Sequence, residues 1–414
     1  MNILVATLGS YGDVFPMVAI AASLSQRGHS VTLFTNAYFR SLAARYGLDF
    51  VPLGTEEEYR RFADHPGLFD PRQGFSVFMS TLVLPNIRRA YEQLQARIQP
   101  GKTVIVTSLT VFAARLIQEK LSIPTVTIHP MPMAIKSAYE IPKAAGISLP
   151  AWSPRWLRQL YWWVADKAVI DPMICPELNA LRQEIGLPPV GRVLSRWVHS
   201  PQRVICLFPE WYASPQPDWP PETHLTGFIL FAEGDEDELG EEVLEFLNSG
   251  EAPVVFMPGS LMQQAQAIFE ESVKACEMLG KRAILLSRYA QQIPKHLPPG
   301  IRHFGYIPFS RLLPHAAALV HHGGIGTGAQ AMRAAVPQLI HPMAYDQYDN
   351  AARLRALGVS DWIGPGDYRA PRVADKLREL TESPSVRERR QAVAARFENI
   401  DPLGDTCKLI ETML

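Results

Sequence analysis

Leu319-Val320-His321-His322-Gly323-Gly324-Ile325-Gly326-Thr327 is the stretch of sequence that decides the fold. An apolar strand, 319–322, runs into three glycines, and a helical segment, 329–335, follows. Glycine lets the backbone approach a ligand closely, and the free amides at the start of a helix bind phosphate. A plain turn between a strand and a helix would need only one glycine. The stretch therefore predicts a phosphate-binding turn between a strand and a helix.

The N-terminal residues have the same organisation. An apolar run, 3–8, stops at Gly9-Ser10-Tyr11-Gly12, and residues 16–27 then show helical periodicity. Gly28 is expected to end this helix, and residues 31–35 form the next strand. A strand, a glycine-rich turn, a helix and another strand are the beginning of a doubly wound α/β domain.

Two series of such units follow each other along the chain. The first continues with strands at 104–107 and 125–128 around a helix at 112–120; the second has strands at 254–257, 283–286, 319–322 and 338–341 and a helix at 263–279. Residues 209–221 lie between the two series and contain five prolines, which is typical of a linker. We therefore expect an α/β protein with two doubly wound, Rossmann-like domains that face an interdomain cleft.

Composition and charge narrow the range of functions. The net charge of -1 does not favour a nucleic acid as partner. The four cysteines lie far apart without a CxxC pair, so we expect neither a zinc site nor a disulfide framework. The N-terminus has no basic region typical of a signal peptide, and no apolar run has the ~20 residues of a spanning helix. We expect a cytoplasmic protein that can meet a membrane only at its inner surface.

Further polar and aromatic residues follow strands of the second series. Asp346 and Gln347 come after the strand at 338–341, where a carboxylate and a carboxamide could hold vicinal hydroxyls; a surface turn is the alternative. Tyr306 could stack on a base, or it could belong to the core. The acidic run 235–238 contains an Asp-x-Asp triplet, but we interpret it as a solvated segment.

Together these motifs resemble the GT-B fold inverting glycosyltransferases of family 1, which use UDP- and dTDP-sugars. The segments Cys175-Pro176-Glu177-Leu178-Asn179-Ala180-Leu181-Arg182 and Leu207-Phe208-Pro209-Glu210-Trp211 are similar to the rhamnosyltransferases of rhamnolipid biosynthesis. The resemblance implies an acceptor-binding domain at 1–208, a linker at 209–221 and a donor-binding domain at 222–392. It also implies that the C-terminal helix, 393–414, returns to the first domain.

The resemblance also implies roles for individual residues in donor binding. His321 would bind the phosphate and assist catalysis, and His322 occupies a position that varies. The nucleotide and its phosphates would contact a set of residues from three turns: Gly259, Ser260, Tyr306, the Ile307 backbone, Gly323, Gly324, Gly326 and Thr327. Asp346 and Gln347 would hold the sugar. No metal and no cofactor besides the nucleotide-sugar co-substrate is expected.

Two departures from the family pattern affect the interpretation. Ala329 replaces the glutamate that grips the ribose hydroxyls, which favours a 2′-deoxyribose and hence dTDP. The family's catalytic histidine is replaced by Asp13, and Thr107-Ser108-Leu109 lacks the supporting aspartate. Asp13 would therefore act alone as general base, with a cap or first-turn residue of a helix as the alternative.

A tryptophan-rich segment has three possible interpretations. Trp152, Trp156, Leu160 and Trp163 share one face of a helix, which indicates a core-facing helix, an acceptor tunnel wall or a membrane contact. His129 could border the same pocket or be structural. The predicted acceptor pocket comprises Ser10, Tyr11, His129, Trp156 and Trp163.

The function that fits these observations is transfer of a sugar, L-rhamnose from dTDP-rhamnose, to a hydroxyl of a lipophilic acceptor such as a hydroxy-fatty acid. The first alternative is a UDP-glucosyltransferase acting on a terpenoid, sterol or phenolic acceptor. A nucleotide-sugar epimerase and a non-catalytic helper of a partner enzyme also remain open at this point. The intact Asp13, His321, Asp346 and Gln347 argue against the helper.

Overall fold

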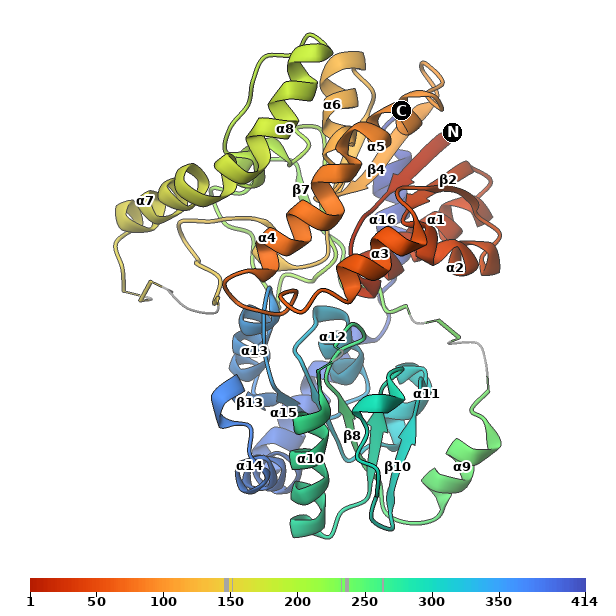
Figure 1. The fold of residues 1–414 in the computed structure, drawn as a ribbon, viewed down its shortest axis with the longest axis vertical. Helices are drawn as coiled ribbons and strands as arrows, with labels where there is room; N and C mark the ends of the chain where they lie inside the picture. The colour runs from red at the N-terminus through yellow and green to blue at the C-terminus, as the bar shows by residue number, and fades with distance from the viewer. Residues whose placement is uncertain (145–148, 151, 232, 235–237, 263) are drawn as a thin grey trace. The chain divides into compact units, whose positions relative to one another are not determined.

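The computed structural model describes residues 1–414 except 145–148, 151, 232, 235–237 and 263. The chain divides into two compact units (Figure 1). The first unit comprises 1–142, 146–229 and 401–414, and the second comprises 143–145 and 230–400. Residues 209–221, expected to form the linker, therefore lie inside the first unit. The Asp-x-Asp triplet at 235–237 lies outside the described residues.

The first unit is built on a parallel sheet of seven strands in the order β3-β2-β1-β4-β5-β6-β7. Its central strands are buried along their whole length, because a parallel sheet is covered on both faces. The strands are β1 (Asn2–Ala6), β2 (Ser30–Thr35), β3 (Asp49–Pro52), β4 (Thr103–Ser108), β5 (Thr125–His129), β6 (Val204–Cys206) and β7 (Thr223–Leu225).

The second unit is built on a parallel sheet of six strands in the order β10-β9-β8-β11-β12-β13. These strands are β8 (Val254–Met257), β9 (Ala283–Leu286), β10 (Ile301–Phe304), β11 (Ala318–His321), β12 (Gln338–Ile340) and β13 (Ser360–Trp362). Both strand orders are doubly wound and reverse direction once, between β1 and β4 and between β8 and β11. The predicted fold class, two Rossmann-like α/β sheets, is confirmed.

The helices of the first unit include the last one of the chain. They are α1 (Tyr11–Gln26), α2 (Arg40–Arg45), α3 (Glu56–Ala63), α4 (Gly74–Phe78), α5 (Ile87–Gln95), α6 (Phe112–Leu121), α7 (Arg155–Ala165), α8 (Asp171–Glu184) and α16 (Pro402–Glu411). Helix α16 packs against α1. Glu411 near its end accepts hydrogen bonds from Arg27 Nε at 2.8 Å and lies 2.8 Å from His29 Nε2.

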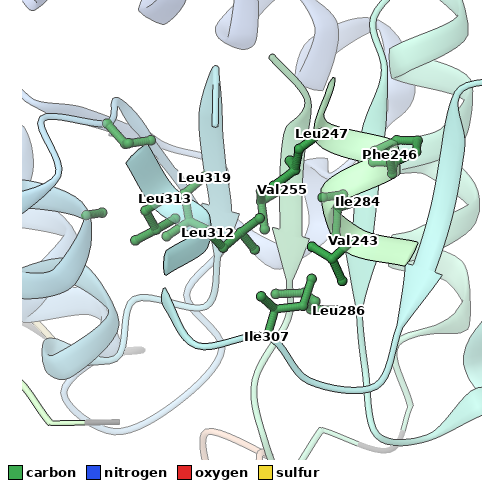
Figure 2. Packing of buried hydrophobic residues seen from close by; sticks show 12 residues of the cluster. Val243, Phe246, Leu247, Val255, Ile284, Leu286, Ile307, Leu312, Leu313 and Leu319 are labelled. Carbon is green, nitrogen blue, oxygen red and sulfur yellow. The ribbon is translucent and has the colours of Figure 1, made fainter. Parts of the chain in front are cut away.

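The helices of the second unit enclose its sheet and bury a hydrophobic core. They are α9 (Glu241–Asn248), α10 (Gln266–Leu279), α11 (Phe309–Leu312), α12 (Ile325–Arg333), α13 (Gln347–Ala356), α14 (Ala370–Glu382) and α15 (Pro384–Ala394). Figure 2 shows Val243 and Leu247 of α9 packed with Val255 and Ile284 of the sheet, and Ile307 at the edge of the same cluster. Burial of such side chains is the main source of the unit's stability.

Two helices begin earlier than the sequence predicts. Helix α1 was expected from Pro16 but begins at Tyr11, because Ser10 and Asp13 form a capping box at its N-terminus. Helix α12 was expected from 329 but begins at Ile325, so Gly326 and Thr327 lie in its first turn. Glycine lowers helix propensity, which hides this first turn in the sequence.

Each sheet presents its predicted loops at the point where the strand order reverses. In the first unit these loops follow β1 and β4, and in the second they follow β8 and β11. Ligands of doubly wound sheets bind beyond the carboxyl ends of the strands at this point. In the described part of the chain, no helix has the length and apolarity needed to cross a membrane.

Candidate active site

The turn after β11 contains two histidines in different environments. His321 is the last residue of the strand and is 1% exposed. Its Nδ1 accepts the N–H of Gly323 at 3.1 Å, so the ring proton is on Nε2, which donates to Oε1 of Gln338 at 3.0 Å. Burial, together with the neighbouring His322, lowers the pKa of His321 to about 3. The ring is therefore neutral, and both of its nitrogens are used inside the protein.

His322 is the first residue beyond the strand, which ends one residue earlier than expected. It makes no hydrogen bond with any described residue, and its Nδ1 is buried without a partner. The ring lies against two turns: a β-carbon on Gly324 would be 2.6 Å from Nε2, and one on Gly259 would be 3.5 Å from Cγ. Burial lowers the pKa of His322 to about 4, so the neutral ring keeps one N–H for donation.

The N-terminus of α12 has free amide groups next to this ring. Its N-cap is Gly324, which offers no capping side chain, and the first helical bond runs from Gly328 N to Gly324 O. The amides of Ile325, Gly326 and Thr327 precede the first helical bond and have no intrahelical acceptor. They carry the positive end of the helix dipole, so the turn is suited to bind an anion.

Gly323 brings this turn close to the next one along the sheet. Its φ is +95°, and a β-carbon would lie 2.9 Å from the Ile340 side chain and 3.0 Å from the carbonyl oxygen of Gln347. The Asn350 amide Nδ2 donates to Gly323 O at 2.9 Å and to Asp346 Oδ2 at 2.7 Å. Asn350 thus holds the Asp346 carboxylate beside the glycine turn.

The Gln347 side chain forms hydrogen bonds mainly within its own loop. Its Oε1 accepts the N–H groups of Met343 at 2.8 Å and Ala344 at 3.0 Å, and the residue is 4% exposed. Tyr345 in the same loop has φ +56°, in the left-handed region. Of the Gln347 side chain, the Nε2 group is left as the possible contact with a sugar hydroxyl.

The residues expected at the nucleobase lie in the loop after β10. Tyr306 is 43% exposed, donates its hydroxyl to Glu233 O at 2.8 Å, and has the Arg288 guanidinium 5.2 Å from its ring centroid. Ile307 is 3% exposed, and its side chain belongs to the core cluster in Figure 2. Ser260 is exposed in the turn after β8. Tyr306 is therefore a partly exposed ring, and only the backbone of Ile307 is suited to meet a ligand.

In the first unit, Asp13 bends back toward the N-terminus of its own helix. Its carboxylate accepts two hydrogen bonds at Oδ2, from Ser10 N at 2.8 Å and from Ser10 Oγ at 3.1 Å. A β-carbon on Gly9 would lie 2.2 Å from this oxygen, so the turn needs glycine there. Burial raises the pKa of Asp13, while the bonds from Ser10 oppose that shift.

A small hollow lies beside Asp13. It is lined by residues from the carboxyl ends of β4 and β5, from the loops after β4, β5 and β6, and from α1: Asp13, Pro16, Met17, Ser108, Leu109, Thr110, Ile128, Pro130 and Leu207. The hydroxyls of Ser108 and Thr110 bond to each other at 2.7 Å, and Thr110 also bonds to Leu8 O at 2.7 Å. Neither hydroxyl bonds to Asp13 among the described contacts, so the carboxylate has no partner in this region besides Ser10.

Comparisons with known proteins match both units. Residues 3–140 match the N-terminal domain model of glycosyltransferase family 28, and residues 280–402 match the C-terminal domain model of the erythromycin biosynthesis protein CIII-like family. The chain is a glycosyltransferase of the GT-B fold.

Three individual proteins illustrate the range of its relatives. This glycosyltransferase is 28% identical to the O-mycaminosyltylonolide 6-deoxyallosyltransferase of Streptomyces fradiae, over 99% of this chain and 97% of that protein. It is 26% identical to a sterol 3-beta-glucosyltransferase of Candida albicans, over 96% of this chain and 27% of that protein. The spinosyn rhamnosyltransferase complexed with thymidine diphosphate shares the fold, with TM-score 0.69, 17% identity and coverage of 99% and 100%.

The residues predicted to form the acceptor pocket are Ser10, Tyr11, His129, Trp156 and Trp163. None of these five residues lines the hollow beside Asp13. Ser10 caps α1, and the Tyr11 hydroxyl bonds to the Tyr38 hydroxyl at 2.9 Å. His129 is fully buried with its Nε2 2.9 Å from His199 Nδ1, and burial lowers the pKa of His129, as for a structural histidine.

The interpretation of the tryptophan segment as a core-facing helix is wrong. Helix α7 has no buried residue, and Trp156 and Trp163 are 64% and 51% exposed. The helix contacts the rest of its unit partly through Trp162, which donates Nε1–H to Ser137 O at 2.8 Å. Helical periodicity identifies an apolar face but does not reveal what that face meets.

Sequence reasoning missed two residues that position the glycine turn after β11. Gln338 orients His321, and Asn350 connects Gly323 to Asp346. A buried polar residue at the start of a strand, such as Gln338, is a usable signal, because buried amides need partners. Among the described residues, no group of three or more His, Cys, Asp or Glu side chains could hold a metal ion.

Proposed function

We propose that the second unit binds a nucleoside diphosphate sugar at the N-terminus of α12, with His322 as the side-chain donor to the leaving phosphate. The observation that carries this proposal is the contrast between the two histidines. His321 has both ring nitrogens engaged, whereas His322 has none engaged and lies against the N-cap of the helix. His321, expected to contact the phosphate, would instead hold the turn in place.

The remaining donor contacts follow from their positions around this turn. The Thr327 hydroxyl and the amides of the first helical turn would surround the pyrophosphate, and Ser260 would approach it from the turn after β8. Asp346, held by Asn350, would accept hydrogen bonds from sugar hydroxyls. Tyr306 would stack on the base, and the Ile307 backbone would pair with the edge of the base.

The proposed reaction is a single inverting displacement without a metal. The acceptor oxygen attacks the anomeric carbon, the bond from that carbon to the phosphate oxygen breaks, and the nucleoside diphosphate leaves. The acceptor proton passes to Asp13, whose Oδ1 accepts no hydrogen bond from the described residues. Desolvation raises the pKa of this carboxyl and makes it a stronger base than an exposed aspartate.

Positioning and charge stabilisation at the leaving group would supply more of the rate than the base. Preorganised donors aimed at developing charge are worth ~10²–10³-fold each. The helix amides, Thr327 and His322 are such donors for the departing phosphate. A neutral histidine also avoids a positive charge that would hold the product nucleotide too tightly.

We propose dTDP-rhamnose as donor and a lipophilic hydroxyl compound, such as a hydroxy-fatty acid, as acceptor. The buried Ala329 leaves no carboxylate for a ribose 2′-hydroxyl, which supports a deoxyribose nucleotide. The name of the spinosyn rhamnosyltransferase, solved with thymidine diphosphate, agrees with this donor. The segment 175–182 supports the similarity to the rhamnolipid rhamnosyltransferases. Contact with the inner surface of a membrane would give access to such acceptors.

A UDP-glucosyltransferase acting on a terpenoid, sterol or phenolic acceptor is the second candidate. The sterol 3-beta-glucosyltransferase that matches 96% of this chain supports it. Both candidates share the chemistry proposed above and differ in the nucleobase and sugar of the donor and in the acceptor.

Transfer assays with defined substrates distinguish the two candidates. Purified protein is incubated with dTDP-rhamnose or UDP-glucose and with a hydroxy-fatty acid, a sterol or a flavonoid, and the products are identified by mass spectrometry. We expect rhamnosyl transfer to the hydroxy-fatty acid, unchanged by excess chelator. Glucosyl transfer to the sterol would replace the first candidate with the second. Activity lost in chelator and restored by manganese would contradict the metal-free reaction.

A further inference from the structure

Helix α7 presents an apolar stripe that the rest of its unit leaves uncovered. We define the tryptophan face as Trp152, Trp156, Leu160, Trp163 and Val164, which follow one another at intervals of one to four residues. Their exposed fractions are 81%, 64%, 45%, 51% and 46%. Figure 1 shows α7 at the edge of the first unit, away from its strands. Isolated exposed apolar residues are common, but a contiguous stripe indicates a contact surface.

The rings of this face differ from the other aromatic rings of the segment. Trp162 points inward, where it donates to Ser137 O and lies 5.1 Å below the Lys136 ammonium. Trp156 and Trp163 make no hydrogen bond or ring contact with any described residue. The helix is thus attached to its unit by one side and leaves indole rings, each with a free N–H, on the other.

Positive charge borders the tryptophan face. Arg155 lies over the Tyr139 ring at 4.1 Å, and Arg158 donates to Tyr139 O. Lys167 is exposed just beyond the end of the helix, with its Nζ 3.9 Å from Asp171 Oδ2. The acidic side chain within this segment, Asp166, is fully buried and paired with Lys136 at 2.9 Å. On the adjoining loop the exposed Glu140 lies 3.3 Å from the amide of Gln216. The chain as a whole has a net charge of -1, whereas helix α7 itself contains two arginines and no acidic residue.

We infer that the tryptophan face docks on an anionic lipid surface. Indole rings favour the level of the lipid headgroups, because they combine an apolar body with an N–H donor. A helix with such a face and adjacent Arg and Lys residues lies in the plane of the interface, held by apolar burial and by attraction to anionic headgroups. This inference does not depend on the sugar or the acceptor of the proposed reaction.

Vesicle binding tests the inference directly. The full chain is sedimented with vesicles of phosphatidylcholine alone and of phosphatidylcholine with an equal part of phosphatidylglycerol, without donor or acceptor. We expect binding to the mixed vesicles at least about tenfold stronger than to the neutral ones, weakening as salt is raised. Quenching of tryptophan fluorescence by brominated lipid should accompany binding.

Two double variants with matched controls locate the contact. We expect Trp156→Ala with Trp163→Ala to weaken binding about tenfold or more, because two interfacial indoles are lost. Arg155→Gln with Lys167→Gln should remove most of the preference for the mixed vesicles. Leu244→Ala with Met278→Ala, and Lys102→Gln with Lys120→Gln, change exposed residues elsewhere and should leave binding unaltered.

Three outcomes would overturn the inference. The first is absence of binding by the native chain, and the second is an equal loss of binding in the control variants. The third is a concentration-dependent dimer that disappears in the tryptophan variant, because the tryptophan face would then be a protein interface. Since these assays contain no nucleotide-sugar, their failure would leave the proposed transfer reaction unaffected, and failure of that reaction would leave the docking surface standing.

Discussion

Replacing His321 by alanine should mainly lower stability, whereas replacing His322 by alanine should mainly lower turnover. His321→Ala leaves the Gly323 N–H and the Gln338 carboxamide without their partner, and each unsatisfied buried group costs ~1–3 kcal/mol. A unit of this size loses ~2–4 °C of melting temperature per kcal/mol, so we expect a fall of several degrees or more. His322→Ala breaks no hydrogen bond with a described residue, and its melting temperature should stay within ~2 °C of the native value.

Turnover, in contrast, should fall most in the His322 variant. His322→Ala removes the proposed donor to the leaving phosphate, and we expect a loss of ~10²–10³-fold in kcat, with partial recovery in His322→Gln, which keeps an N–H donor. The assays are product formation under saturating donor and thermal unfolding of the same preparations. Full turnover in His322→Ala, together with a large loss in a stable His321→Ala protein, would refute the assignment and restore His321 as the phosphate ligand.

Three further predictions concern the base, the nucleotide and pH. Asp13→Asn should keep dTDP affinity within about threefold while kcat falls ~10²-fold, and unchanged turnover would exclude Asp13 as the general base. Because burial raises the pKa of Asp13, the native enzyme should begin to lose activity on acidification at a pH above the ordinary pKa of an aspartate. With Ala329 in place of a ribose-binding glutamate, calorimetry should show dTDP binding at least as tightly as UDP, and a preference for UDP of about tenfold would favour the glucosyltransferase. In the folded protein His321 and His322 have pKa values of about 3 and about 4, below the ordinary 6.5, so the unfolded chain binds more protons below pH 6.5. The free energy of unfolding should therefore fall as the pH drops from 6.5 toward 4. A free energy of unfolding that stays constant over this range would contradict the burial of both histidines in the neutral form.

The sequence predicts the strands and the fold well because both depend on local patterns. Apolar runs that stop at glycine turns predict β1, β8 and β11 to within one or two residues at each end. The alternation of these strands with helices predicts two doubly wound sheets. The same reasoning places the starts of α1 and α12 too late. In α1 the prediction begins at Pro16, but a capping box starts the helix at Tyr11, and in α12 the low helix propensity of glycine hides the first turn.

The details of the site depend on contacts between distant residues, which local patterns do not contain. His321 and His322 are adjacent and chemically identical in the sequence, and Gln338, 17 residues away, decides that His321 is the engaged one. Asn350 acquires its importance by reaching back to Gly323, 27 residues earlier. The tryptophan face has the helical period of a core helix, and only the packing of its unit shows that the face is exposed.

A crystal structure of the protein with dTDP bound would test the central claim most directly, because it locates the pyrophosphate relative to both histidines. We predict phosphate oxygens within hydrogen-bonding distance of the α12 amides, the Thr327 hydroxyl and a ring nitrogen of His322, with the bond between His321 and Gln338 intact. A pyrophosphate bound to His321 with that bond broken, or bound away from the N-terminus of α12, would contradict the account.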